Sequence, residues 1–155
     1  MKINYVIATY NGDSKRGKNY PFFNNGNFVL KLHLNRLFQL QHNLSQITVM
    51  KPESDNYFDD YYNSDLLLDK SVITHSCENF GYSMGQWLKA YEIYKDQFDY
   101  YCFIEDDYCA NLDNFDLIFS KIYQEKFPNN IGVLASVVEG SKDYAQLQCY
   151  PPHGS

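Results

Sequence analysis

The sequence predicts an α/β fold, with a mainly parallel, twisted and Rossmann-like sheet flanked by helices. The chain has 155 residues, of which 45% are apolar and 17% aromatic, enough for the core of one domain. Short β-branched and aromatic runs alternate along it with longer stretches of helical periodicity, the pattern of an α/β protein. The first run is apolar almost throughout, as is typical of a strand that a parallel sheet buries on both faces.

The elements follow one another in an alternating order. The first strand is expected at residues 3–9, and the polar stretch 12–27 after it is long for a connection inside a compact domain. The clearest helix is expected over residues 28–44, because leucines recur on one face of it. Further strands are expected at residues 47–50, 72–74, 100–104 and 131–138. Residues 149–155 contain proline and glycine and are expected to form a loop.

Polar residues mark where two further helices begin. Ser83 is followed three residues later by Gln86, which matches a capping box at the start of a helix. Asp113 is suited to cap a third helix. We expect His33 and His42, on the first helix, to be surface residues, since the histidines have no metal-ligand spacing.

Charge and hydropathy exclude several classes of protein. The net charge of −6 argues against a protein that binds nucleic-acid phosphates through lysine and arginine. No segment approaches the roughly 18 consecutive apolar residues of a membrane span, and the first ten residues are too polar for a signal peptide. The four cysteines form no CxxC pair, which favours reduced thiols and a cytoplasmic protein.

An acidic triplet is the sharpest feature of the sequence. Glu105, Asp106 and Asp107 directly follow the apolar run at residues 100–104. Adjacent carboxylates repel one another, so holding them at the end of a strand is costly unless a cation compensates their charge. Mg²⁺ and Mn²⁺ prefer such oxygen ligands. They often bind only one or two protein carboxylates and keep their other coordination positions for water and for the phosphate oxygens of a substrate. A solvated acidic turn is the alternative interpretation.

Other motifs are absent or ambiguous. The sequence has no GxGxxG after the first strand, no P-loop and no GxSxG elbow, which disfavours dehydrogenases, P-loop NTPases and α/β-hydrolases. Gly81 and Gly85 flank the start of the second helix, where they either expose backbone N–H groups to an anion or form a tight turn. Trp87 is expected in the core rather than in a ligand platform.

Several segments together resemble the nucleotide-sugar-binding half of a GT-A fold glycosyltransferase, in the nucleotide-diphospho-sugar transferase superfamily. The segment 3–12 is similar to the opening strand and loop of that family, and 79–85 to the turn before the helix that leads to the metal site. The E-D-D at 105–107 resembles the DxD motif, and the likeness follows the family's order along nearly the whole chain.

The resemblance implies a metal-dependent glycosyltransferase that binds Mn²⁺ or Mg²⁺. Asp107 is the implied direct metal ligand, together with Glu105. The implied contacts of the nucleotide sugar are Thr9, Tyr10, Asn11, Glu53, Asn79, Gly81 and Asp106. The donor is expected to be a UDP- or GDP-sugar and the acceptor a glycan or another hydroxyl compound. No catalytic base is identified, because the family's acceptor part normally follows the last strand and only residues 139–155 lie beyond it here.

Two other functions stay open at this point. The chain is one domain that ends about where an acceptor-binding part is expected, so it is alternatively a non-catalytic nucleotide-sugar-binding domain of a larger protein. A sugar nucleotidyltransferase is the third possibility, because residues 12–17 faintly resemble the glycine-rich basic loop of those enzymes.

Overall fold

A computed structural model describes the chain in five stretches. They are residues 1–10, 26–53, 72–126, 133–137 and 146–150. The chain forms two compact units, Met1–Asp113 and Asn114–Ser155. Within the described stretches, the first unit contains a parallel sheet and two helices, and the second contains one helix and a strand pair.

The first unit is built on a four-stranded sheet in the order β3-β2-β1-β4, with every neighbouring pair parallel. The strands are β1 (Ile3–Ala8), β2 (Gln46–Pro52), β3 (Val72–Cys77) and β4 (Tyr100–Glu105). All of β1 is buried, as its apolar sequence predicts. The α/β class and the parallel sheet are therefore confirmed.

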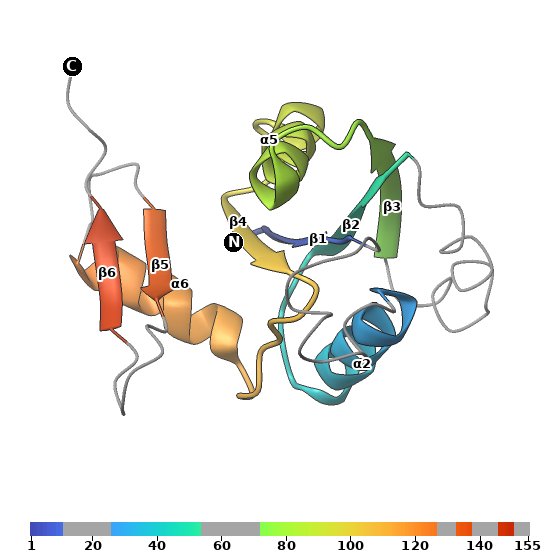
Figure 1. Cartoon of the computed structure of the whole chain (residues 1–155). Helices are drawn as coiled ribbons and strands as arrows, with labels where there is room; N and C mark the ends of the chain where they lie inside the picture. The colour runs from blue at the N-terminus through green and yellow to red at the C-terminus, as the bar shows by residue number, and fades with distance from the viewer. Residues whose placement is uncertain (11–25, 54–71, 127–132, 138–145, 151–155) are drawn as a thin grey trace, which may run out of the picture. The chain divides into compact units, whose positions relative to one another are not determined.

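Two helices cover opposite faces of this sheet. Helix α2 (Gly26–Gln39) lies below the sheet and α5 (Tyr82–Tyr94) above it in the view of Figure 1. Side chains alternate between the two faces of a strand, so Tyr5 points toward α2, where it bonds to His33. Its neighbour Val6 points toward α5 and packs beside Ala90.

The α5 face of the sheet carries a compact apolar cluster. Val6, Met50, Cys77 and Ala90 form it, with Trp87 and Tyr101 packed against it. Trp87 lies against the core, as predicted. Burial of this kind contributes about 25 cal/mol for each Å² of apolar surface, so this cluster anchors α5 to the sheet.

Helix α2 ends before the predicted residue 44. Helix α2 stops at Gln39, because a tight turn follows in which the Leu40 N–H donates to the Leu37 carbonyl. Helix α5 ends at Tyr94, and Asp96 beyond it has a positive φ of 66°, which an α-helix cannot continue through. Strand β2 extends to Pro52, two residues beyond the predicted end.

The second unit contains α6 (Phe115–Lys126), β5 (Val133–Val137) and β6 (Gln146–Tyr150). Strand β5 is at the predicted position, but it pairs antiparallel with β6 rather than parallel. The prediction of a loop from residue 149 was wrong, because β6 continues to Tyr150. A short polar and apolar alternation precedes the prolines there, and its pairing with β5 makes it a strand.

Within the described ranges, no helix is long and apolar enough to cross a membrane.

Candidate functional site

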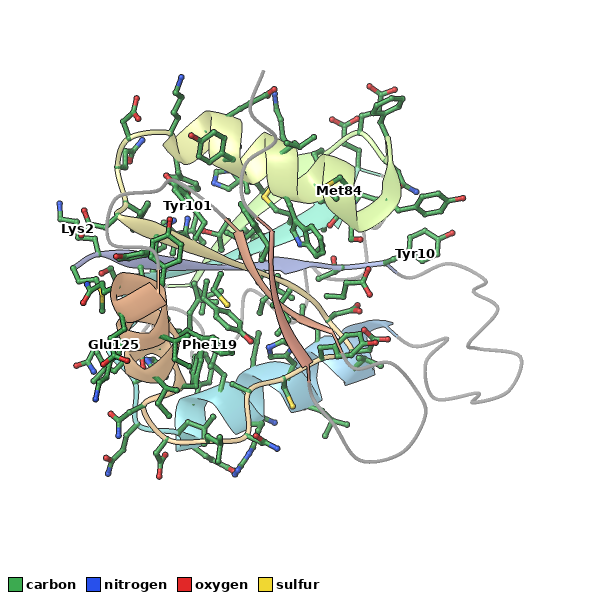
Figure 2. All side chains as sticks on the ribbon, turned by 90° about the vertical axis from the view of Figure 1, so that its left-hand side faces the viewer. Lys2, Tyr10, Met84, Tyr101, Phe119 and Glu125 are labelled. Carbon is green, nitrogen blue, oxygen red and sulfur yellow. The ribbon has the colours of Figure 1, made fainter. Side chains whose placement is uncertain are left out.

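The predicted site residues gather at the carboxyl edge of the parallel sheet. The chain adds β2 and β3 on one side of β1 and then returns to place β4 on its other side. In sheets of this kind, ligands bind outside the carboxyl ends of the strands at this switch point. Figure 2 shows Lys2 and Tyr10 at opposite ends of β1, with Met84 of α5 on the Tyr10 side.

The acidic turn after β4 is bonded directly to the end of β1. The last paired residues of the two strands are Ala8 and Glu105. Immediately beyond them, the Asp106 N–H donates to the Ala8 carbonyl over 3.0 Å, and the Tyr10 N–H donates to Asp106 Oδ2 over 3.4 Å. The end of β1 and the acidic turn therefore meet in one place, although Tyr10 and Asp106 are 96 residues apart in the sequence.

Gln86 of α5 holds the residue between these contacts. Its Oε1 accepts from the Thr9 N–H over 2.9 Å, and its Nε2 donates to the Thr9 carbonyl over 2.8 Å. Only 2% of Gln86 is exposed. The Thr9 N–H also donates to the Met50 carbonyl of β2 over 3.0 Å, so Thr9 is held both by β2 and by α5.

The predicted capping box was wrong. In the described structure, Gly81 is the N-cap of α5, and no side chain caps this helix end. Ser83 lies one residue inside the helix, where its hydroxyl donates to Glu105 Oε1 over 2.7 Å. Both members of the predicted box, Ser83 and Gln86, therefore bond to the strand ends instead of to their own helix.

The prediction that His33 is a surface residue was also wrong. His33 is 2% exposed, with Nδ1 3.0 Å from the Asp106 carbonyl oxygen and Nε2 2.9 Å from the Tyr5 hydroxyl. A carbonyl only accepts, so Nδ1 carries the proton and donates to Asp106, and Nε2 accepts from the Tyr5 hydroxyl. The contacts thus assign one neutral tautomer to the ring.

Burial explains the protonation of this pair. Loss of water lowers the pKa of His33 from 6.5 to about 4, an effect that the bond to the Asp106 carbonyl partly opposes. Burial also raises the pKa of Tyr5 far above its usual value, with nearby Cys102 and Cys109 adding to the shift. Tyr5 therefore stays protonated and remains a hydrogen-bond donor to the ring.

Gly81 and Gly85 form a tight turn at the start of α5. This is one of the two roles that the sequence suggested for them, the other being to expose backbone N–H groups to an anion. A Cβ added to Gly85 would overlap the Phe80 carbonyl oxygen, so only glycine fits there. Gly81 has a φ of 73°, and Tyr82 after it has a φ of 56°. This turn sets the helix against the sheet so that Ser83 and Gln86 reach the strand ends.

The remaining predicted contacts lie along the same edge. Tyr10 is 43% exposed, whereas Thr9 is buried and its hydroxyl donates to the Met50 carbonyl over 2.9 Å. Glu53 follows β2, where its N–H bonds to the Cys77 carbonyl, and its side chain is exposed. Asn79 and Gly81 are exposed between β3 and α5. Asn11 lies outside the described residues.

The acidic turn offers carboxylates without forming a complete metal cage. Among the residues described, no three Asp, Glu, His or Cys side chains are grouped to hold a metal ion. Glu105 bonds to Ser83 and Asp106 to Tyr10, so these two carboxylates face different neighbours. A Mg²⁺ or Mn²⁺ ion on a diphosphate needs only one or two protein carboxylates, because water and phosphate oxygens complete its shell.

Comparison with known proteins gives no family or relative: no protein-family model, curated protein or solved structure matches this chain. The function is therefore inferred from the geometry and chemistry of the carboxyl edge.

Two buried residues of the site were missed at the sequence level, although their spacing contained a signal. His33 lies three residues after Leu30 and four before Leu37, on the apolar face of α2. Gln86 lies four residues before Ala90, which faces the sheet from α5. Their helical positions indicate burial, but the spacing does not indicate their hydrogen-bond partners.

Proposed function

We propose that the protein is a metal-dependent glycosyltransferase of the GT-A type, which moves a sugar from a nucleoside diphosphate to an acceptor hydroxyl. One observation carries the proposal: the acidic turn after β4 is hydrogen-bonded to the end of β1 at the switch point of a parallel sheet. The strand order β3-β2-β1-β4 supports a Rossmann-like sheet of this type, whose ligands bind at that edge.

In this proposal, Asp107 and Glu105 hold Mn²⁺ or Mg²⁺. The cation, when bound, neutralises the charge that develops on the departing nucleoside diphosphate. Ser83 orients the Glu105 carboxylate through its hydroxyl, and the Tyr10 N–H does the same for Asp106. The other proposed contacts of the nucleotide sugar are Thr9, Asn11, Glu53, Asn79 and Gly81. No residue is assigned as the catalytic base.

The proposed donor is a UDP- or GDP-sugar, and the proposed acceptor is a glycan or another hydroxyl compound. We assign the protein to the cytoplasm, where the thiols of Cys77 and Cys109 stay reduced.

A binding experiment tests the donor and metal site. Calorimetry with UDP- and GDP-sugars is expected to detect binding only when Mn²⁺ or Mg²⁺ is present. Asp107→Asn removes a charged ligand without changing its shape, and we expect affinity to fall between about 10-fold and 100-fold. Glu92→Gln is the matched control, because it removes one negative charge from the exposed side of α5 and leaves the edge of the sheet intact. Binding without metal, or equal affinity in both variants, contradicts the proposal.

A turnover experiment separates the enzyme from its alternatives. Transfer or hydrolysis of a bound UDP- or GDP-sugar supports a glycosyltransferase, whereas binding with no turnover identifies a nucleotide-sugar-binding domain. Pyrophosphate release from a nucleoside triphosphate identifies a nucleotidyltransferase. The segment 12–17 that suggested this third function lies outside the described residues.

A further inference from the structure

We propose that Gln86 and His33 are positioning residues, which hold the two ligand-binding loops in their binding conformation from opposite sides of the sheet. The inference rests on the proposed function, and it extends that function to two side chains that do not themselves touch a ligand. Each is 2% exposed, so each acts only through the main chain that it bonds.

The pairing of β1 with β4 ends just before the site. Their register stops at Ala8 and Glu105, and both chains then turn into the segments that carry the predicted ligand contacts. Each backbone group that is buried beyond this point needs a partner. The N–H groups of Thr9 and Asp106 still donate to the strands, to the carbonyls of Met50 and Ala8. The carbonyls of the same two residues take their partners from the two helices.

Gln86 bonds both polar groups of Thr9, at 2.9 Å and 2.8 Å. Two bonds from one planar amide restrict both the position and the orientation of the Thr9 backbone. The Thr9 N–H and the Thr9 hydroxyl both donate to the Met50 carbonyl of β2 as well. The chain is therefore held in place immediately before Tyr10, which is the first exposed residue of the loop.

His33 makes the matching contact on the α2 face. Its Nδ1–H donates to the carbonyl of Asp106, while Tyr5 donates to its other nitrogen and holds the ring. The Asp106 N–H donates to Ala8, so both backbone groups of Asp106 are bonded. The central residue of the acidic triplet is thus held by β1 on one side and by α2 on the other.

The two contacts are linked through the loops themselves. The Tyr10 N–H donates to the Asp106 carboxylate, so a change at Gln86 passes through Thr9 and Tyr10 to the acidic turn. Held in this way, the main chain at Thr9 and Asp106 needs no ordering when a ligand binds, and a ligand then binds more tightly. A purely structural role would lower the stability of the fold and leave the affinity of the folded protein unchanged.

Hydrogen exchange and binding of Mn²⁺·UDP and Mn²⁺·GDP to the full chain test this inference. Gln86→Met keeps the length of the side chain and removes both bonds to Thr9. Tyr94→Phe is the matched control, because it removes one hydrogen bond, to His75, from the far end of the same helix. Gln86→Asn is a second variant, which keeps a neutral amide but shortens the side chain by one methylene, so that the amide is drawn back from Thr9.

The Asp106 amide is the informative probe, because its acceptor, the Ala8 carbonyl, is unchanged in every variant. We expect Gln86→Met to accelerate its exchange and to weaken nucleotide binding, each by about tenfold, because the buried Thr9 carbonyl loses its donor while the Thr9 N–H keeps the Met50 carbonyl. Tyr94→Phe is expected to leave both values unchanged. The Ser45 amide, which bonds to Ile3 at the opposite edge, should exchange equally in all variants.

Equal exchange of the Asp106 amide in Gln86→Met and Tyr94→Phe overturns the inference, and so does faster exchange with an unchanged dissociation constant. If the wild-type protein binds neither nucleotide, the proposed function fails, and exchange alone then decides whether Gln86 positions the acidic turn. If Gln86→Met does not fold, Gln86→Asn is measured in its place, with the same signs expected.

Discussion

Acidification is expected to destabilise the protein through His33. The buried ring is neutral in the folded state, with a pKa near 4, and regains an ordinary pKa of 6.5 when the chain unfolds. Between these two values the unfolded state binds a proton that the folded state does not. The folded state is therefore favoured in full above pH 6.5, and this advantage is lost as the pH falls toward 4.

The size of the effect follows from the shift. A difference of about 2.5 pH units at 1.36 kcal/mol per unit corresponds to about 3 kcal/mol of unfolding free energy. The structure gives the cause. Protonation places a second N–H against the Tyr5 hydroxyl, which then has to give up its role as donor to the ring. The charge also lies in a site where 2% of the residue is exposed to water.

The assay is urea unfolding of the wild type and of His33→Gln at several values between about pH 7 and pH 4. Glutamine does not titrate, and its amide carries both a donor and an acceptor. The difference in unfolding free energy between the two proteins is expected to shrink by about 3 kcal/mol over this range. Burial also lowers the pKa of His75. The titration of His75 and of the carboxylates changes the unfolding free energy of both proteins equally, so it cancels in the difference between them.

The same substitution at His42 serves as the control for the loss of an imidazole. A His33→Gln protein with the same pH dependence as the wild type would show that His33 is not the titrating group. In that case, both the tautomer and its cause would have to be reconsidered.

Two further predictions concern the turn at the start of α5. Gly85→Ala is expected to cost about 3 kcal/mol in urea unfolding, because its Cβ overlaps the Phe80 carbonyl, whereas Gly81→Ala should cost only about 1–2 kcal/mol of left-handed backbone strain. If the two variants lost the same unfolding free energy, the backbone around Gly85 would have to shift at little cost to accommodate the added Cβ. Tyr82→Gly is expected to raise the unfolding free energy by about 1 kcal/mol, since the side chain is 82% exposed and its φ is 56°. A lower melting temperature for this variant would indicate that the exposed ring makes a stabilising contact.

Strand positions were predictable because local hydrophobicity determines them. The run at the start of the chain is too apolar to face water on either side, and it became the fully buried β1. The alternation of such runs with helical periodicity correctly indicated a parallel sheet. It also indicated that Asp106 and Tyr10 lie at the same edge, because parallel strands share the edge where their carboxyl ends lie.

Element ends and strand partners were less predictable. The pattern at Ser83 and Gln86 predicted hydrogen bonds within the first turn of their own helix. In the structure, Ser83 bonds to Glu105 and Gln86 bonds to Thr9, both at the ends of strands. Strand β6 was missed because a five-residue alternation is weak on its own and becomes a strand only when β5 pairs with it.

By itself, the sequence determined where the strands of the parallel sheet run, that this sheet is parallel, and that an acidic triplet follows one of its strands. Only the tertiary structure decided which side chains hold that triplet in place. Gln86 and Thr9 are 77 residues apart, and His33 and Asp106 are 73 apart. Hydrophobic periodicity is a local pattern, which extends over a few turns of helix or a few residues of strand. It predicts that a position is buried, but it does not predict which distant residue will hydrogen-bond to a polar side chain at that position. That partner depends on strand order and on the way each helix packs, which are set by contacts across the whole unit.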